Sequence, residues 1–264
     1  MRSRTVSFVL AALSFSTALV PSAGATSLRF LADANIPTGS KVAGTNFGGL
    51  SGLAYDPVRE ELLILSDDKS ELQPARYYRA KVSIASGRVT LDPFAFTTLT
   101  RADGTVFPKG SIDPEAIARL DARRLFVSSE GARKANPRIP PAIFELDADG
   151  RVVRSLPVPE KFIPEKTGKP TRGLVDNCAF ESLAITPSRR SLFTATECPL
   201  VQDDTPASFK KSGVSRILRY RLVGEHRVPK GWPSISGTES PRCSPSTSAP
   251  CSSSSAAPRA GRAT

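Results

Sequence analysis

Short runs of alternating apolar and polar residues, separated by turn residues, make up most of this chain. Three stretches share one pattern, over residues 50–68, 113–131 and 179–198. Each contains an apolar-Ala pair, a polar turn with Arg, a strand-like apolar run, and a closing acidic residue after Ser or Thr. Period-two alternation bounded by turn residues predicts a β-hairpin. The chain therefore repeats one hairpin three times.

A second predicted hairpin follows each copy. Its strands are expected over 77–84 and 88–96, over 142–146 and 151–157, and over 216–222 with a short run to 228. Two hairpins make four strands, and a four-stranded unit in tandem is typical of a β-propeller blade. We therefore predict an all-β propeller with four-stranded blades. A β-helix is the alternative, although its repeats are much shorter.

The spacing of the repeat predicts long loops. The equivalent residues Ser51, Glu115 and Glu181 are 64 and 66 residues apart, which is longer than in the commonest propellers. The proline-containing stretches 137–141 and 157–170 are expected to be such loops.

The amino-terminal stretch 1–25 is typical of a secretory signal peptide. Arg2 and Arg4 precede an apolar run over 6–20, and Ala23-Gly24-Ala25 is a small-x-small cleavage site. The run is short for a membrane span, so a membrane anchor is the less favoured alternative. We expect cleavage after Ala25, a periplasmic or secreted protein, and no membrane association after cleavage.

The propeller domain is predicted over 26–229, and the pattern stops there. The stretch 230–264 is rich in Ser, Pro, Ala and Arg without an apolar period, a composition that cannot bury enough surface to order itself. It is either a disordered tail or the product of a reading-frame shift. About three blades are present where a closed propeller needs at least four, so we expect a C-terminally truncated propeller.

Amino-acid composition limits the kinds of ligand and partner that the protein is expected to bind. The formal net charge of +11 is either a solvated basic surface, the favoured interpretation, or a means of attracting anionic substrates or surfaces through long-range fields. The expected partner is a small anionic or ester substrate. There is no basic helix or run of like charges, so nucleic acid binding is not expected. One histidine and no C-x-x-C motif argue against structural zinc. We expect a monomer.

Acidic residues stand at equivalent positions of the repeat. Glu115 and Glu181 begin the first strand of their hairpins, and Asp67, Glu130 and Glu197 end the second strand. Because paired antiparallel strands bring these positions to one end of the hairpin, we predict a carboxylate ring at one mouth of a channel. Clustered carboxylates favour a cation, and calcium prefers several oxygen ligands. The first two are the predicted catalytic residues and the other three the predicted metal ligands; alternatively, all five bond loop amides.

Basic residues are the next candidates. Arg76 and Arg172, together with Lys69, are predicted to bind substrate, with surface ion pairing as the alternative. A Ser-His-acid triad is not supported, because the single histidine, His226, lies in a weak predicted strand. Ser51 also lacks the glycine spacing of a nucleophile elbow.

Two of the four cysteines flank the third repeated hairpin. Cys178 starts one strand and Cys198 ends the next, so antiparallel pairing brings them together. Opposed residues approach to about 4.5 Å at Cα, and disulfides tolerate about 4.4–6.8 Å. We predict a Cys178–Cys198 disulfide, with two free thiols as the alternative. Cys243 and Cys251 are expected to have no structural part.

Several strings resemble the phytase-like family, "esterase-like activity of phytase". They are GGLSGLAYDP, DPEAIA, LFVSSEG, PEKFIP, TRGLVDNCAFESLAITP, LFTATE and SRILRY, and they cover about residues 30–222. The resemblance implies an exported propeller with phosphatase- or esterase-like hydrolysis, by kinship to calcium-using propeller phytases. The alternative function is a non-catalytic propeller that binds a ligand or partner through its channel face.

Overall fold

The computed structural model describes residues 27–132 and 135–223. The predicted signal peptide, the short run to 228, His226 and the tail 230–264 lie outside these residues. Within them the fold is almost entirely β, with one short 3₁₀ helix, η1 (Glu160–Phe162). None of the helical structure described is long or apolar enough to cross a membrane.

The first large sheet is a four-stranded antiparallel meander in the order β3-β4-β5-β6. Its strands are β3 (Leu50–Asp56), β4 (Glu61–Ser66), β5 (Arg76–Ala85) and β6 (Arg88–Thr98). A two-stranded hairpin, β1 (Lys41–Val42) and β2 (Thr45–Asn46), precedes it.

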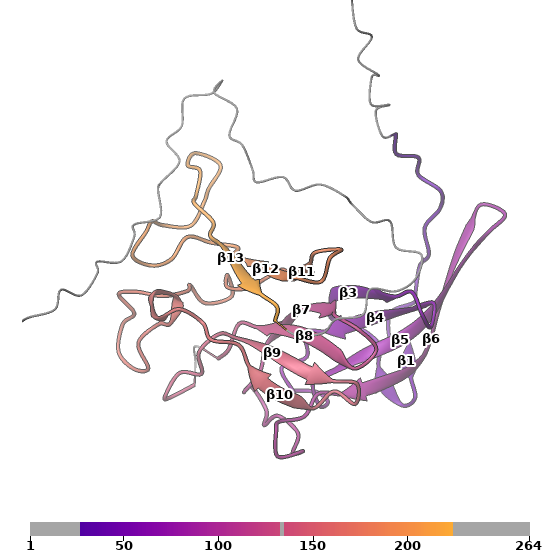
Figure 1. The fold of residues 1–264 in the computed structure, drawn as a ribbon, viewed down its shortest axis with the longest axis horizontal. Coiled ribbons are helices and arrows are strands. Elements are labelled where there is room, and N and C mark those ends of the chain that lie inside the picture. Colours follow the sequence, from indigo (N-terminus) through magenta and orange to yellow (C-terminus); the bar gives the residue numbers. More distant parts are fainter. Residues whose placement is uncertain (1–26, 133–134, 224–264) are drawn as a thin grey trace, which may run out of the picture.

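The second large sheet repeats this arrangement. Its strands lie side by side in sequence order and are β7 (Pro114–Arg119), β8 (Arg124–Ser129), β9 (Ala142–Asp147) and β10 (Val152–Ser155). The third sheet has three described strands, β11 (Ala184–Ile185), β12 (Ser191–Ala195) and β13 (Ile217–Arg221). Figure 1 shows the three sheets following one another with chain colour, from purple through magenta to orange.

The sheets pack against one another in series because their middle strands are buried on both faces. In β4, Leu63 and Leu65 face the second sheet, whereas Ile64 packs with Tyr78 against the β1–β2 hairpin. In β8, Leu125 and Val127 face the first sheet and Phe126 faces the third. Successive side chains of a strand point to opposite faces, so one apolar run serves two interfaces.

The first strands of the first two sheets approach closely. A Cβ added to Gly52 of β3 would lie 2.9 Å from the backbone nitrogen of Ile117 in β7, so only glycine allows this distance. Ser51 Oγ donates a hydrogen bond of 3.1 Å to the carbonyl of Pro114. The first strands of the two sheets, β3 and β7, are therefore in direct contact.

Each repeated hairpin carries one extra residue in its first strand. The register passes from Leu50↔Ser66 to Gly52↔Leu65 and from Pro114↔Ser129 to Ile117↔Val127. In the third hairpin it passes from Phe180↔Thr196 to Ala184↔Phe193. These are β-bulges, which leave a residue outside the ladder and re-aim its side chain. The bulges contain Ser51, Glu115 and Glu181, the equivalent positions of the repeat.

The all-β prediction is confirmed, and the first two repeats form the predicted four-stranded units. The third repeat contributes three strands to the described part. The residues described do not form a closed propeller, so the propeller and its number of blades stay predictions.

Candidate functional site

Three carboxylates meet where β7 begins and β8 ends. Asp113 immediately precedes β7, Glu115 lies in its bulge, and Glu130 immediately follows β8. One oxygen from each carboxylate lies within 4.8 Å of the others. The backbone of Glu130 donates to the carbonyl of Asp113 at 3.0 Å, which holds the two chain ends together. We call Asp113, Glu115 and Glu130 the carboxylate cluster.

Neighbouring sheets hold the cluster from two sides. Lys69, which follows β4 in the first sheet, donates to Asp113 Oδ2 at 2.5 Å. Glu130 Oε1 accepts a hydrogen bond from the backbone of Ala179 in the third repeat. Asp113 and Glu130 are buried and Glu115 is half-buried. All three members belong to the second repeat, and the first and third repeats each add one contact, from Lys69 and Ala179.

Burial and mutual repulsion perturb these groups strongly. Burial raises the pKa of Glu115 to about 8, and the carboxylates of Glu181, Asp113 and Asp67 add to the effect. Lys69 opposes it but does not cancel it. A pKa near 8 allows a carboxyl group to exchange a proton at neutral pH, which is a property of catalytic sites.

The pKa of Glu130 is also raised to about 8, first by burial and then by hydrogen bonding and repulsion from Glu181. The hydrogen bond from Ala179 opposes this rise. Burial likewise raises the pKa of Asp113, although Lys69 offsets part of the effect.

The cluster fits a hard divalent cation. All its donors are carboxylate oxygens, which calcium prefers. Asp113 Oδ1 is buried and has no hydrogen-bond partner among the described residues. An unsatisfied buried acceptor is unfavourable, and a cation beside it would satisfy it while relieving the repulsion.

The remaining predicted acidic residues lie around the cluster or apart from it. Glu181 is exposed, lies just before β11, and interacts with both Glu115 and Glu130. Asp67 is exposed and its charge acts on Asp113 and Glu115. Its carboxylate packs on Gly49, where any side chain would collide with it.

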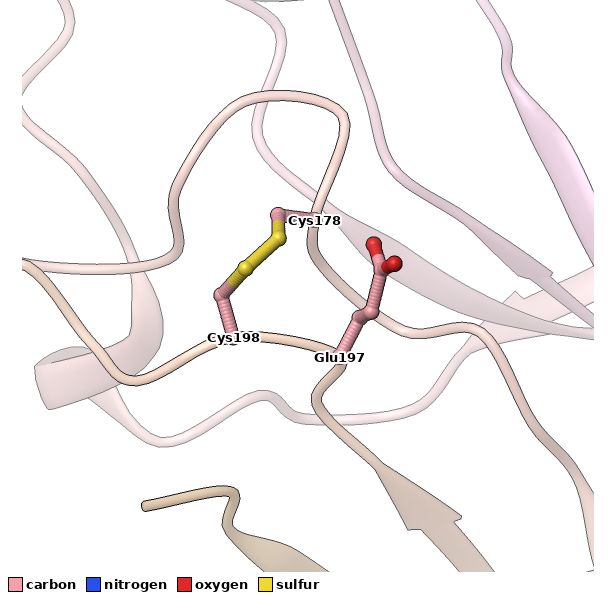
Figure 2. Close-up of side chains that lie close together, drawn as sticks. All are labelled: Cys178, Glu197 and Cys198. Atoms are coloured by element: carbon pink, nitrogen blue, oxygen red, sulfur yellow. A yellow bond between two sulfur atoms is a disulfide. The ribbon is translucent and has the colours of Figure 1, made fainter. Parts of the chain in front are cut away.

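Glu197 lies beside a disulfide instead. Cys178 and Cys198 are bonded, with their Cα atoms 5.3 Å apart, and Figure 2 shows the Glu197 side chain next to the bond. One atom each of Glu197, Cys178 and Cys198 come within 4.8 Å of one another. Because the disulfide consumes both thiols, this group does not provide the thiolates that bind a metal.

The two predicted substrate-binding arginines already have carboxylate partners. Arg76 is buried and bonds Asp68 at 2.9 Å, and it also donates to Tyr78 Oη at 2.6 Å. Arg172 is exposed and pairs with Glu160 at 2.8 Å. Their role in substrate binding stays a prediction. Of the three predicted basic residues, Lys69 is the one that contacts the cluster.

Asp113 was not among the predicted site residues. Its equivalent positions in the other repeats are Gly49 and Ala179, so comparison of the repeats gives no acidic signal there. The only local sign was its place in the string DPE, two residues before Glu115.

The raised pKa values predict that the protein becomes less stable as pH rises from about 5 to 8. The folded cluster keeps protons that the unfolded chain releases near pH 4.5, so the free energy of unfolding falls across this window. Thermal unfolding without divalent cations should show a falling Tm, and Glu115→Gln should flatten the fall because Gln does not titrate.

Glu71→Gln is the matched control for this experiment, because Glu71 is exposed and outside the cluster. The control should reproduce the wild-type slope. A Tm that stays constant or rises between pH 5 and 8 in the wild type would contradict the raised pKa values.

Comparison with known families is consistent with the site. The family model described as "Phytase-like: Esterase-like activity of phytase" matches residues 45–233, a stretch that includes the whole cluster. No curated protein matches the chain.

Proposed function

This chain belongs to the phytase-like family, described by the esterase-like activity of phytase, and we propose on that basis that it hydrolyses phosphoester or carboxylic ester bonds with the aid of calcium. We further propose that it is an exported β-propeller. Serial packing of antiparallel sheets, joined at their first strands, supports the propeller. The stretch 1–25 supports export.

The observation that carries the proposal is the carboxylate cluster with its unpartnered Asp113 Oδ1. Asp113 and Glu130, its two buried members, would hold the calcium ion. When bound, calcium supplies positive charge that polarises an ester and offsets the carboxylates.

Glu115 and Glu181 are then the proposed acid and base. Glu181 is exposed beside the cluster and would accept a proton from the attacking water. The oxygen of that water would at the same time bond to the phosphorus or carbonyl carbon of the ester. Glu115 can hold a proton near neutral pH and would give it to the alcohol oxygen as the ester bond breaks. Lys69 would attract an anionic substrate towards this end of the sheets.

Chelation tests the role of the cation. Hydrolysis of p-nitrophenyl phosphate and p-nitrophenyl acetate should fall after EDTA treatment and recover on adding calcium chloride. The physical reason is that chelation removes the positive charge that would polarise the ester. An unchanged rate after complete chelation, verified by metal analysis, would contradict calcium assistance. Calcium binding without hydrolysis of either ester would favour the non-catalytic alternative.

A further inference from the structure

A cavity of about 210 Å³ lies directly beside the carboxylate cluster. Glu130 belongs to the cluster and also lines this cavity, so the two share one residue. Its wall is mostly apolar and comes from the loops after β8, after η1 and after β12, with contributions from Pro141, Pro164, Leu174, Val175 and Val201. Pockets of this kind, apolar with a few polar groups, are where small molecules bind.

The loops that form the pocket are bonded to one another. Arg138 bonds residues on the facing loop, through its backbone to the carbonyl of Lys166 and through Nη1 to that of Glu165, both at 2.8 Å. Val201 donates to the carbonyl of Gly173 at 2.9 Å. A side chain at Gly173 would collide with the backbone of Pro164. These contacts fix the walls, so the pocket exists without a ligand.

The pocket is lined by two basic residues, Arg138 and Lys169. Both Nη atoms of Arg138 bond backbone carbonyls, of Glu165 and Gly168, but its Nε is buried and has no partner among the described residues. Lys169 adds a second positive charge to the lining. Glu130 and Asp176 are the acidic lining residues. Lys169 is exposed, so it is the lining residue that can pair with an anionic group of a ligand.

We propose that this pocket binds the apolar alcohol part of a phosphate monoester, with Lys169 attracting the phosphate and the ester bond towards the carboxylate cluster. This inference rests on the proposed hydrolytic function and names its substrate class. The preferred substrate is an aryl or similarly apolar phosphate monoester, because a polyol with many phosphates would place charged groups against the apolar wall.

Binding of a non-hydrolysable analogue tests the pocket. Calorimetric titration with phenylphosphonate and methylphosphonate, in calcium chloride, compares ligands that differ only in the apolar group. Burial of the phenyl ring should make phenylphosphonate bind about 10- to 100-fold more tightly. Val201→Phe should remove most of this preference by filling the pocket. Val214→Phe is the matched control, because Val214 is exposed and does not line the pocket.

Equal affinity of the wild type for the two phosphonates would overturn the proposal, as would a full phenyl preference in Val201→Phe. Circular dichroism should verify that the Val201→Phe variant is folded. Lys169→Met, at an exposed position, should independently weaken the binding of both phosphonates. Phenylphosphonate binding without any ester hydrolysis would count against the proposed function but support the pocket. Ester hydrolysis without a preference for phenylphosphonate would support the proposed function but count against the pocket.

Discussion

Replacing Glu115 with Gln is expected to lower the hydrolysis of p-nitrophenyl phosphate by about 100-fold or more. Gln preserves the size and shape of the side chain but cannot give a proton to the leaving alcohol, and proton transfer typically contributes about 10²–10⁴ in rate. Burial raises the pKa of Glu115, so the wild-type rate should also fall as pH rises through that pKa, which a bound calcium ion would lower. Steady-state rates between pH 5 and 9 measure both effects.

The comparison variants separate catalysis from charge and folding. Glu71→Gln removes one negative charge from an exposed position and should keep the wild-type rate and pH profile. Glu115→Gln should lose the alkaline fall that belongs to Glu115. If Glu115→Gln hydrolyses the ester at the wild-type rate, Glu115 is not the acid. If its rate drops but the alkaline fall is unchanged, another group provides the proton.

Removing the disulfide is expected to lower the free energy of unfolding by about 3 kcal/mol. The bond joins residues 20 apart, and closing a loop of this size restricts the unfolded chain by about that amount. The double variant Cys178→Ser/Cys198→Ser should therefore unfold at lower urea concentration. Non-reducing peptide mapping of the wild type should recover Cys178 and Cys198 in one linked peptide.

The same variant should also reduce activity, because the disulfide anchors the segment that carries Ala179 and Glu181. Ala179 donates to Glu130, and Glu181 is the proposed base. A reducing agent is the internal control: it should destabilise the wild type and leave the double variant unchanged. Alkylation of both wild-type thiols without reduction would contradict the bond, and equal urea midpoints would contradict its stabilising effect.

Local hairpins could be predicted from the sequence because their cause is local. The run ELLILS, now β4, is buried on both faces, and a continuous apolar run bounded by turns predicts such a strand. The third repeat was harder. Its first strand is only Ala184–Ile185, because the three bulge residues 181–183 stand opposite two residues of the partner strand.

The candidate site was predictable only where it repeats. Equivalent positions located Glu115, Glu130 and Glu181, whereas Asp113 has no acidic counterpart. Its partner Lys69 comes from another sheet, 44 residues away. That contact depends on how whole sheets pack, and alternation within one hairpin contains no information on the distance between two sheets. The pocket was missed for the same reason, since its walls are three loops without a common pattern.

The β-bulge in each first strand separates the pairing of the strand from the chemistry of one side chain, two properties that a regular ladder would link. A residue within the ladder must suit both its pairing and its chemistry, whereas Ser51, Glu115 and Glu181 lie outside the paired register. The side chain at this position can therefore change between repeats while the hairpin keeps its pairing. The first repeat has a hydroxyl there that ties two sheets together, and the later repeats have carboxylates. The same β-bulge thus presents a hydroxyl that connects two sheets in the first repeat and a carboxylate in each of the next two.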